Sequence, residues 1–240
     1  MSYEVELLAI AIAFYLYDSS VLLYSNEVIF TFHGTRGWSA ASGWFGFVFA
    51  GRTLCMLNPL TPHFPSYRLS WAFDALPDAK DVSWSEHAQG QSDLAPWTLA
   101  GGIALFVLLP LGMFTFLGRY LVIPALSLLY GSTLVALYKL SRSKGRSTFG
   151  ARSFRGFAFE CIACPPFSVN MVRRMTLAHS IAEPAPLAAA RLLDGVRWTE
   201  FREECLSRLN AAIQLAGDAA TEVAALQAQK QRLSALVSRI

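Results

Sequence analysis

Two cysteines separated by two residues, Cys161 and Cys164, form the pattern in this sequence that most directly suggests chemistry. Such a pair can supply two thiolate ligands to a metal or act as a redox dithiol. A zinc site needs four ligands, however, and no second cysteine pair or histidine pair follows at the usual spacing. The alternative is that both thiols are small, buried side chains on a strand. We therefore treat Cys161 and Cys164 as weak candidates for a metal or redox site, and we expect no cofactor.

Asp18 is the second candidate, because it is an acid inside an apolar run that begins near Val5 and ends near Tyr24. An ionisable side chain at membrane depth is rare and often functional, as in transport or proton relay. A relay of this kind needs further acids at the same depth, and the sequence supplies none. The alternative is that Asp18 forms hydrogen bonds between helices or reaches the hydrated interface. In that case we expect Asp18→Asn to weaken stability or assembly.

The common catalytic signatures are absent from the sequence. It contains no phosphate-binding loop, no GxSxG elbow, no HExxH pair and no GxGxxG loop. Its histidines are scattered along the chain, as structural or solvated histidines usually are. The sequence therefore favours a non-catalytic role, while the cysteine pair leaves a redox or metal-binding role open.

The composition is typical of a membrane protein. Of the 240 residues, 54% are hydrophobic and only 15% are charged, whereas soluble domains carry about a quarter charged residues. The net charge is only +3, which gives no reason to expect a nucleic-acid partner. The lipid bilayer is therefore the first partner that we expect.

Three segments are apolar enough to be interpreted as membrane spans. A helix needs about 20 apolar residues to cross about 30 Å of hydrocarbon, and residues 5–24 form the first candidate. A second apolar run is more than long enough for two helices, so we expect an antiparallel pair over 97–117 and 120–140. Arg119 would lie in the tight turn between them, where its guanidinium reaches headgroups and water.

Basic residues follow the third span and predict the orientation of the chain. Positive charges next to spans mark the cytoplasmic side, and each one near anionic lipid contributes about 1 kcal/mol. We therefore expect a bacterial inner-membrane protein whose N-terminus lies outside and whose C-terminus lies in the cytoplasm. The residues expected at the membrane surface are Lys139, Arg142, Lys144, Arg146, Arg152 and Arg155.

The parts outside the spans differ in pattern. Residues 26–95 alternate short aromatic and β-branched runs with turn residues, which predicts a small cytosolic β-subdomain followed by an acidic loop. The segment "GWFGFVFAGRTLCML" is alternatively a re-entrant or interfacial segment. Residues 141–182 are predicted to form a basic juxtamembrane segment with a strand near 157–163 and a short helix. With a first transmembrane helix over 1–25 and the hairpin over 96–140, a helical arm over 183–240 completes the chain.

The C-terminal arm has the clearest helical pattern. From Thr199, a plausible N-cap, good helix formers continue to the end of the chain, with apolar residues in steps of three and four. Such a stripe packs either on a partner helix, from a second copy or another protein, or on the chain's own domain. The residues expected to bind a partner are Leu206, Leu209, Ile213, Val223, Leu226, Leu233 and Val237.

These patterns together predict a membrane α-helical fold with three transmembrane helices, two of them a tight hairpin, a small cytosolic β-subdomain and a C-terminal coiled-coil arm. The favoured function is that of a non-catalytic inner-membrane protein, an assembly, anchoring or accessory subunit that binds a partner through the arm. A membrane redox or metal-binding protein that uses Cys161 and Cys164 is one alternative. A small transporter or channel subunit built around Asp18 is another.

Overall fold

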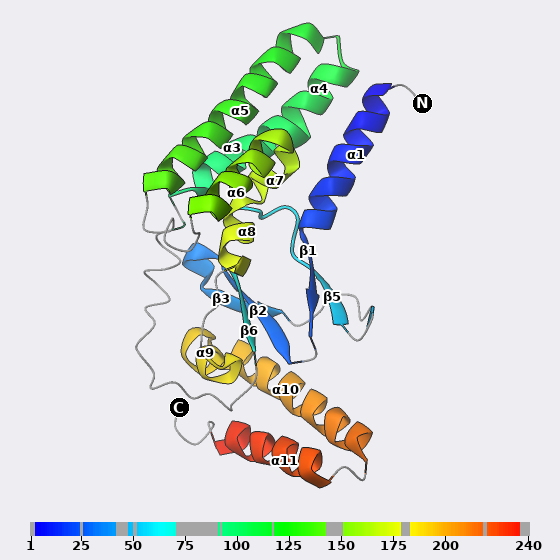
Figure 1. Cartoon of the computed structure of the whole chain (residues 1–240), viewed down its shortest axis with the longest axis vertical. Coiled ribbons are helices and arrows are strands. Elements are labelled where there is room, and N and C mark those ends of the chain that lie inside the picture. The colour runs from blue at the N-terminus through cyan, green and yellow to red at the C-terminus, as the bar shows by residue number, and fades with distance from the viewer. Residues whose placement is uncertain are drawn as a thin grey trace.

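A computed structural model describes residues 3–24, 26–41, 48–49, 52–70, 91, 93–116, 118–142, 151–178, 183–217 and 220–235. Within these residues the protein is mostly helical, with two small sheets in its middle (Figure 1). Apolar helices lie at one end of the molecule and the C-terminal helices lie at the other (Figure 1). The sheets therefore connect two helical layers of different character.

Short strands form two three-stranded antiparallel sheets. The first has the order β1-β5-β4, with β1 (Ser20–Leu23), β5 (Arg52–Met56) and β4 (Val48–Phe49). The second has the order β3-β2-β6, with β3 (Trp38–Ala41), β2 (Glu27–Phe32) and β6 (Ser66–Ser70). A short 3₁₀ turn, η1 (Gly34–Arg36), joins β2 to β3. The central strand β2 carries three fully buried residues, Val28, Ile29 and Phe30, so it contributes to the core on both of its faces.

The apolar layer is a helical hairpin. Its first arm runs through α3 (Ala95–Ile103), the π-helical η2 (Ala104–Leu108) and α4 (Leu109–Phe114), and its second arm is α5 (Gly118–Arg142). Pro110 cannot donate a helical hydrogen bond, and the π-helical turn just before it keeps the first arm continuous. At Gly112 a Cβ would lie 2.9 Å from Val122 Cγ2, so only glycine allows the arms to approach this closely near the turn.

Four further helices surround the inner end of the hairpin. They are α1 (Tyr3–Asp18), α6 (Ala151–Ala163), α7 (Pro165–Val169) and α8 (Met171–Ala178). Tyr15 of α1 and Val169 of α7 are buried against Leu105 and Leu129 of the hairpin. The helix α8 continues toward the sheets and packs on β6 (Figure 1). These helices attach the apolar layer to the sheets.

The C-terminal layer consists of α9 (Ala185–Leu192), α10 (Gly195–Ala216) and α11 (Ala220–Ala235). Asp194 caps α10 by accepting a hydrogen bond from Arg197 N at 2.9 Å. Phe201 of α10 lies 5.8 Å from Phe30 of β2, measured between ring centroids. The sheet β3-β2-β6 and the C-terminal helices therefore share one apolar core.

The prediction of three transmembrane helices is wrong. The helix α1 has 16 residues, about 24 Å at 1.5 Å per residue, which is shorter than the hydrocarbon layer of a bilayer. The expected first span at 5–24 ends early because β1 begins at Ser20 and pairs with β5. Two helices of the described chain have the length and composition of spans, over Ala95–Phe114 and Tyr120–Arg142. By those criteria alone they are candidates for membrane helices.

The hairpin and several strands agree with the sequence pattern. The hairpin is present, but Arg119 was expected in its turn and instead lies in the first turn of α5, because α4 ends at Phe114 and α5 begins at Gly118. Within the segment 26–95 that was expected to form a β-subdomain, strands are present at 27–32 and 66–70. In the segment for which a re-entrant conformation was the alternative, the described residues 48–49 and 52–56 are strands. The acidic loop lies mostly outside the described residues.

Two other secondary-structure predictions differ from the structure. The strand expected near 157–163 is the helix α6, because Phe157 and Cys161 are buried one helical turn apart while Phe159 is 71% exposed. The arm is not one long helix, because Gly217 has a positive φ of 52° and the chain turns back so that α11 packs on α10. Thr199 lies inside α10 and is not its N-cap.

Candidate functional site

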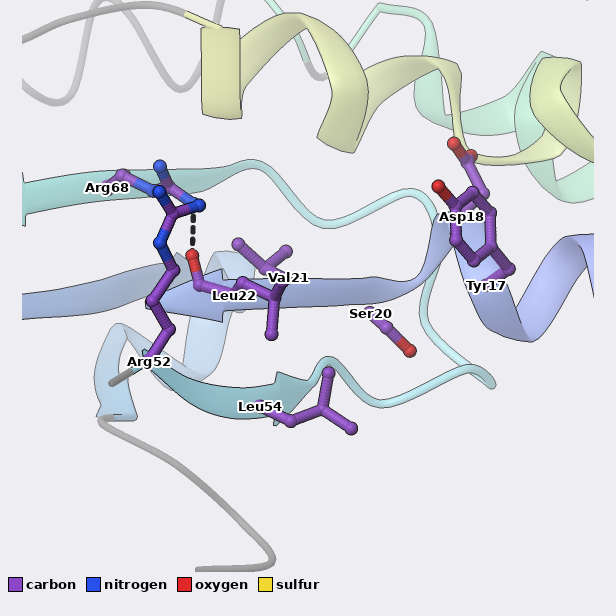
Figure 2. Close-up of a pocket in the computed structure, with 8 residues that line it drawn as sticks. All are labelled: Tyr17, Asp18, Ser20, Val21, Leu22, Arg52, Leu54 and Arg68. Atoms are coloured by element: carbon purple, nitrogen blue, oxygen red, sulfur yellow. Dashed lines mark hydrogen bonds between the residues drawn. The ribbon is translucent and has the colours of Figure 1, made fainter. Parts of the chain in front are cut away.

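A pocket of about 640 Å³ lies along β1, beside the last turn of α1 (Figure 2). One end of the pocket carries an acid, Asp18, and the other end carries two arginines, Arg52 and Arg68 (Figure 2). The middle is formed mainly by aliphatic side chains from β1 and β5. The lining residues are Tyr17, Asp18, Ser20, Val21, Leu22, Arg52, Leu54 and Arg68.

The register of β1 explains why this surface is open. The ladder with β5 starts with a hydrogen bond from Leu57 N to Ser19 O at 3.1 Å. Alternate residues of an antiparallel strand direct their backbone groups to opposite sides, so Ser20 and Leu22 present theirs at the edge away from β5. At that edge Arg68 Nη2 donates to the Leu22 carbonyl oxygen at 2.9 Å.

The two arginines are held by neighbours on β1 and β2 and by Tyr24, which follows β1. Arg52 donates a hydrogen bond to the Tyr24 hydroxyl, and its guanidinium lies 4.3 Å from the centroid of the Tyr24 ring. Arg68 Nε lies 3.8 Å from Glu27 Oε2, beyond hydrogen-bond distance, and this buried nitrogen has no hydrogen-bond partner. The pair of arginines therefore carries one more positive charge than its neighbour Glu27 balances.

Asp18 belongs to a charged chain that joins α1 to α8 and α6. Arg174 Nε lies 3.4 Å from Asp18 Oδ1, and Arg174 Nη2 donates to Glu160 Oε2 at 2.5 Å. Burial raises the pKa of the Asp18 carboxyl, and the nearby Arg174 opposes this shift. The guanidinium of Arg174 also lies 4.6 Å from the centroid of the Phe167 ring. Asp18 is thus an ion-paired residue at a helix end, next to the sheets.

Arg173 is the largest fully buried side chain of the described residues, with 2% exposure. It donates to the carbonyl oxygens of Asn58 and Thr61, the second at 2.7 Å, and thereby ties α8 to the connector between β5 and β6. Burial lowers the pKa of Arg173 to about 10, so it is protonated at neutral pH. On the same side, Asn170 Nδ2 donates to Ser19 Oγ at 3.0 Å.

Burial disfavours the ionised form of both thiols of the cysteine pair in this arrangement. Cys161 is buried on α6, and burial raises the pKa of its thiol to about 12. Burial also raises the pKa of Cys164, which is partly exposed at the end of the helix. Thiolates are the reactive and metal-binding form. Among the described residues no cluster of three or more His, Cys, Asp or Glu side chains is arranged to hold a metal.

The expected partner-binding stripe is largely covered by the chain itself. Leu209 and Leu233 are buried in the core shared with the second sheet, and Leu206 and Leu226 pack against that core. Ile213 and Val223 are half-buried, and Val237 lies outside the described residues. The α10 and α11 helices therefore use the stripe to pack against each other and against the sheet.

Four of the six residues expected at the membrane surface lie on α5 and α6. Lys139 and Arg142 are exposed in the last turns of α5, and Lys139 Nζ lies 5.6 Å from the centroid of the Trp97 ring. Arg155 is exposed on α6, and Arg152 belongs to the first turn of the same helix. Lys144 and Arg146 lie outside the described residues.

The sequence pattern did not point to Arg52, Arg68, Arg173 or Arg174 as members of a site. Arg52 and Arg68 lie on separate strands, and their meeting at one pocket depends on the pairing of β1 with β5 and on β6 lying near β1. The adjacent Arg173 and Arg174 could have indicated that one arginine is buried, because an amphipathic helix places neighbouring residues on different faces. Comparison with protein families, curated proteins and solved structures finds no match to this chain.

Proposed function

We propose that this protein is a non-catalytic integral protein of a bacterial inner membrane, in which the α3–α5 hairpin anchors a cytoplasmic C-terminal module. The module, defined here as α9, α10 and α11 with the sheet β3-β2-β6, would act as an assembly or accessory subunit of a larger complex. The observation that carries the proposal is the contrast in apolar exposure between the two ends of the molecule.

The hairpin leaves large apolar side chains exposed along both arms. Only 28% of the first candidate span and 33% of the second are buried inside the protein. Soluble proteins rarely expose apolar patches of this extent to water, whereas lipid tails cover such a surface without cost. The side chains concerned are Leu99, Ile103, Val107, Leu111, Phe114, Ile123, Leu126, Leu128 and Leu134.

The helices of the module have the opposite character. Among the described residues of α9, α10 and α11, Val196 is the one large apolar side chain that is exposed. Trp198, Phe201 and Leu233 are each less than 9% exposed. Such a segregated surface supports a module that is folded in water and held at the membrane by the hairpin.

The orientation is proposed from the basic residues. Exposed Lys139 and Arg142 end α5 at the end of the hairpin opposite its turn, and exposed Arg155 follows on α6. Positive residues favour the cytoplasmic side, so we place the module in the cytoplasm. An N-terminus outside the cell required a third span, and we therefore propose only the side on which the module lies.

Membrane insertion can be tested with two matched arginine substitutions. Leu134 is 56% exposed on α5, and Val196 is 72% exposed on α10. In a bilayer, Leu134→Arg would cost about 3 kcal/mol of insertion free energy, whereas in water either substitution would be nearly neutral. We expect Leu134→Arg to reduce the carbonate-resistant membrane fraction and Val196→Arg to leave it unchanged. Equal behaviour of both variants, or a wild-type chain in the soluble fraction, would contradict the proposal.

The orientation can be tested with single added cysteines. Phe116, in the turn of the hairpin, is 94% exposed, and Thr199 is exposed on the module. In intact spheroplasts a membrane-impermeant maleimide should modify Phe116→Cys and should reach Thr199→Cys only after lysis. The reverse pattern would place the module outside the cytoplasm.

The partner surface is proposed on the outer, polar faces of α10 and α11, because the chain covers their leucine stripe itself. A photoreactive residue at exposed Ser207 should capture the partner in cells, and the same residue at exposed Arg36, in η1 between β2 and β3, serves as the comparison. Capture of the same protein from both positions, or of none from Ser207, would remove the support for this surface.

A further inference from the structure

The arginine end of the pocket is suited to bind an anion. Arg52 donates to the Tyr24 hydroxyl, just after β1, and Arg68 donates to the Leu22 carbonyl oxygen on β1. Guanidinium groups recognise the oxygens of a phosphate or carboxylate through paired N–H donors. The Nε of Arg68 is buried 3.8 Å from Glu27 Oε2, and the positive charge of Arg52 at the same end is not balanced by that carboxylate. In Figure 2 both guanidiniums lie at the same end of the pocket.

The middle of the pocket is suited to bind an aliphatic chain. Val21, Leu22 and Leu54 form its wall between the arginines and the end of α1 (Figure 2). The wall begins beside the end of α1, where Asp18 lies, and continues along β1 to Leu22, so an alkyl chain can lie along the strand. The volume of about 640 Å³ accommodates such a chain and a small head group.

We propose that this pocket binds a single-chain amphiphile with an anionic head group, a phosphate or a carboxylate. The head group lies at Arg52 and Arg68, and the chain follows Val21, Leu22 and Leu54 toward Tyr17. The opposite direction is disfavoured because, of the residues that line the pocket, both arginines lie at the end away from Asp18. The proposal rests on the proposed function in one respect, because the membrane layer at the end of α1 would supply the amphiphile.

The test uses the full chain in nanodiscs made of zwitterionic lipid, with a photoreactive dodecyl phosphate as the probe. We expect the label on peptides that contain β1 and β5, and we expect dodecyl phosphate to compete for it. Dodecanoate competes equally if the head group is recognised only as an anion, and more weakly if a phosphate is required. Dodecanol tests the chain alone and inorganic phosphate tests the head alone, and each should compete poorly.

Substitutions at the two ends of the pocket sharpen the test. Arg52→Gln should weaken labelling about tenfold, the expected effect of losing one charge-assisted contact. Arg36→Gln removes an exposed arginine outside the pocket and should leave labelling unchanged. Leu54→Gln weakens the chain contact without touching the arginines, so it remains informative if Arg52→Gln should fail to fold.

Three results would overturn the proposal: label confined to the α3–α5 hairpin, equal competition by dodecanol and dodecyl phosphate, or equal labelling of the Arg52→Gln and Arg36→Gln variants. Failure of the proposed function gives a different result. A chain that stays soluble can be labelled in buffer, and labelling at β1 and β5 would then support the pocket without the membrane anchor. If the chain inserts into the membrane but fails these labelling tests, the proposed membrane anchor is supported and the proposed amphiphile pocket is refuted.

Discussion

Truncation of Leu233 tests whether the C-terminal arm packs on its own chain. Leu233 is 1% exposed, and it belongs to the same apolar core as Cys205, which is also 1% exposed. A thiol reagent can reach Cys205 only when α10 and α11 separate from each other or from the second sheet. The rate of labelling at Cys205 therefore reports the free energy of this opening.

The size of the effect follows from the burial of Leu233. Removing a fully buried leucine side chain by Leu233→Ala costs about 2–5 kcal/mol, as the sum of lost transfer free energy and the cavity left behind. If this contact is lost in the open state, the open population rises about thirtyfold at the lower limit and several thousandfold at the upper limit. The labelling rate of Cys205 should increase by the same factor.

Two comparisons make this measurement specific. Gln231→Ala changes an exposed residue of the same helix and should leave the rate nearly unchanged. Cys161 lies in a different apolar core and should keep its own labelling rate in the Leu233→Ala protein. Labelling is read at each cysteine by peptide mass. If Leu233→Ala leaves the Cys205 rate unchanged in the isolated chain, the leucine stripe does not pack on the chain and is available to a partner helix.

Three further predictions concern the hairpin, the charged chain and the cysteine pair. Gly112→Ala should destabilise the hairpin by about 1–3 kcal/mol in thermal unfolding in detergent, because its Cβ would lie 2.9 Å from a valine methyl group, whereas Gly131→Ala enters open space and should not destabilise it. The pKa of Asp18 is raised in the folded chain, so its protonated form contributes stability below pH 4 that is lost as the pH rises through the raised pKa. Asp18→Asn should therefore remove the pH-dependent loss of stability, and the variant should be no less stable than the wild type at pH 7. The sequence alone led to the expectation that this variant is less stable. A clearly lower stability of the variant at pH 7 would refute this reasoning. Maleimide at pH 8 should modify the partly exposed Cys164 first and leave buried Cys161 unmodified until the chain unfolds, and equal rates would contradict the burial of Cys161.

The helical hairpin was predictable because one long apolar run contains it. Nearly uninterrupted apolar residues over 97–140 require two helices, and the break between α4, which ends at Phe114, and α5, which begins at Gly118, lies a few residues before the expected turn. The strands β2 and β6 and the helix α9 were also predictable, since each has a local pattern of alternation or of helix-forming residues between turn residues. These elements depend on interactions between residues close together in the sequence.

The structure differs from prediction where distant segments meet. Residues 20–23 continue an apolar run that suits a helix, but β5 lies alongside and makes them a strand. Phe157 and Cys161 fit both an alternating strand and one turn of a helix, and burial against α5 and α8 decides for the helix. The positive φ at Gly217 gives the arm its turn, although its apolar pattern continues across the break.

In the candidate site, too, local patterns were predictable and contacts between distant segments were not. The sequence by itself determined that the chain contains a long apolar hairpin, a strand-rich segment and a C-terminal stripe of leucines, because these follow from composition and local period. Only the tertiary structure decided that Arg52 and Arg68 line one pocket, that Arg174 pairs with Asp18, and that the leucine stripe packs on the second sheet. Each of these contacts joins residues far apart in the chain, and their pairing depends on how the sheets and helices pack.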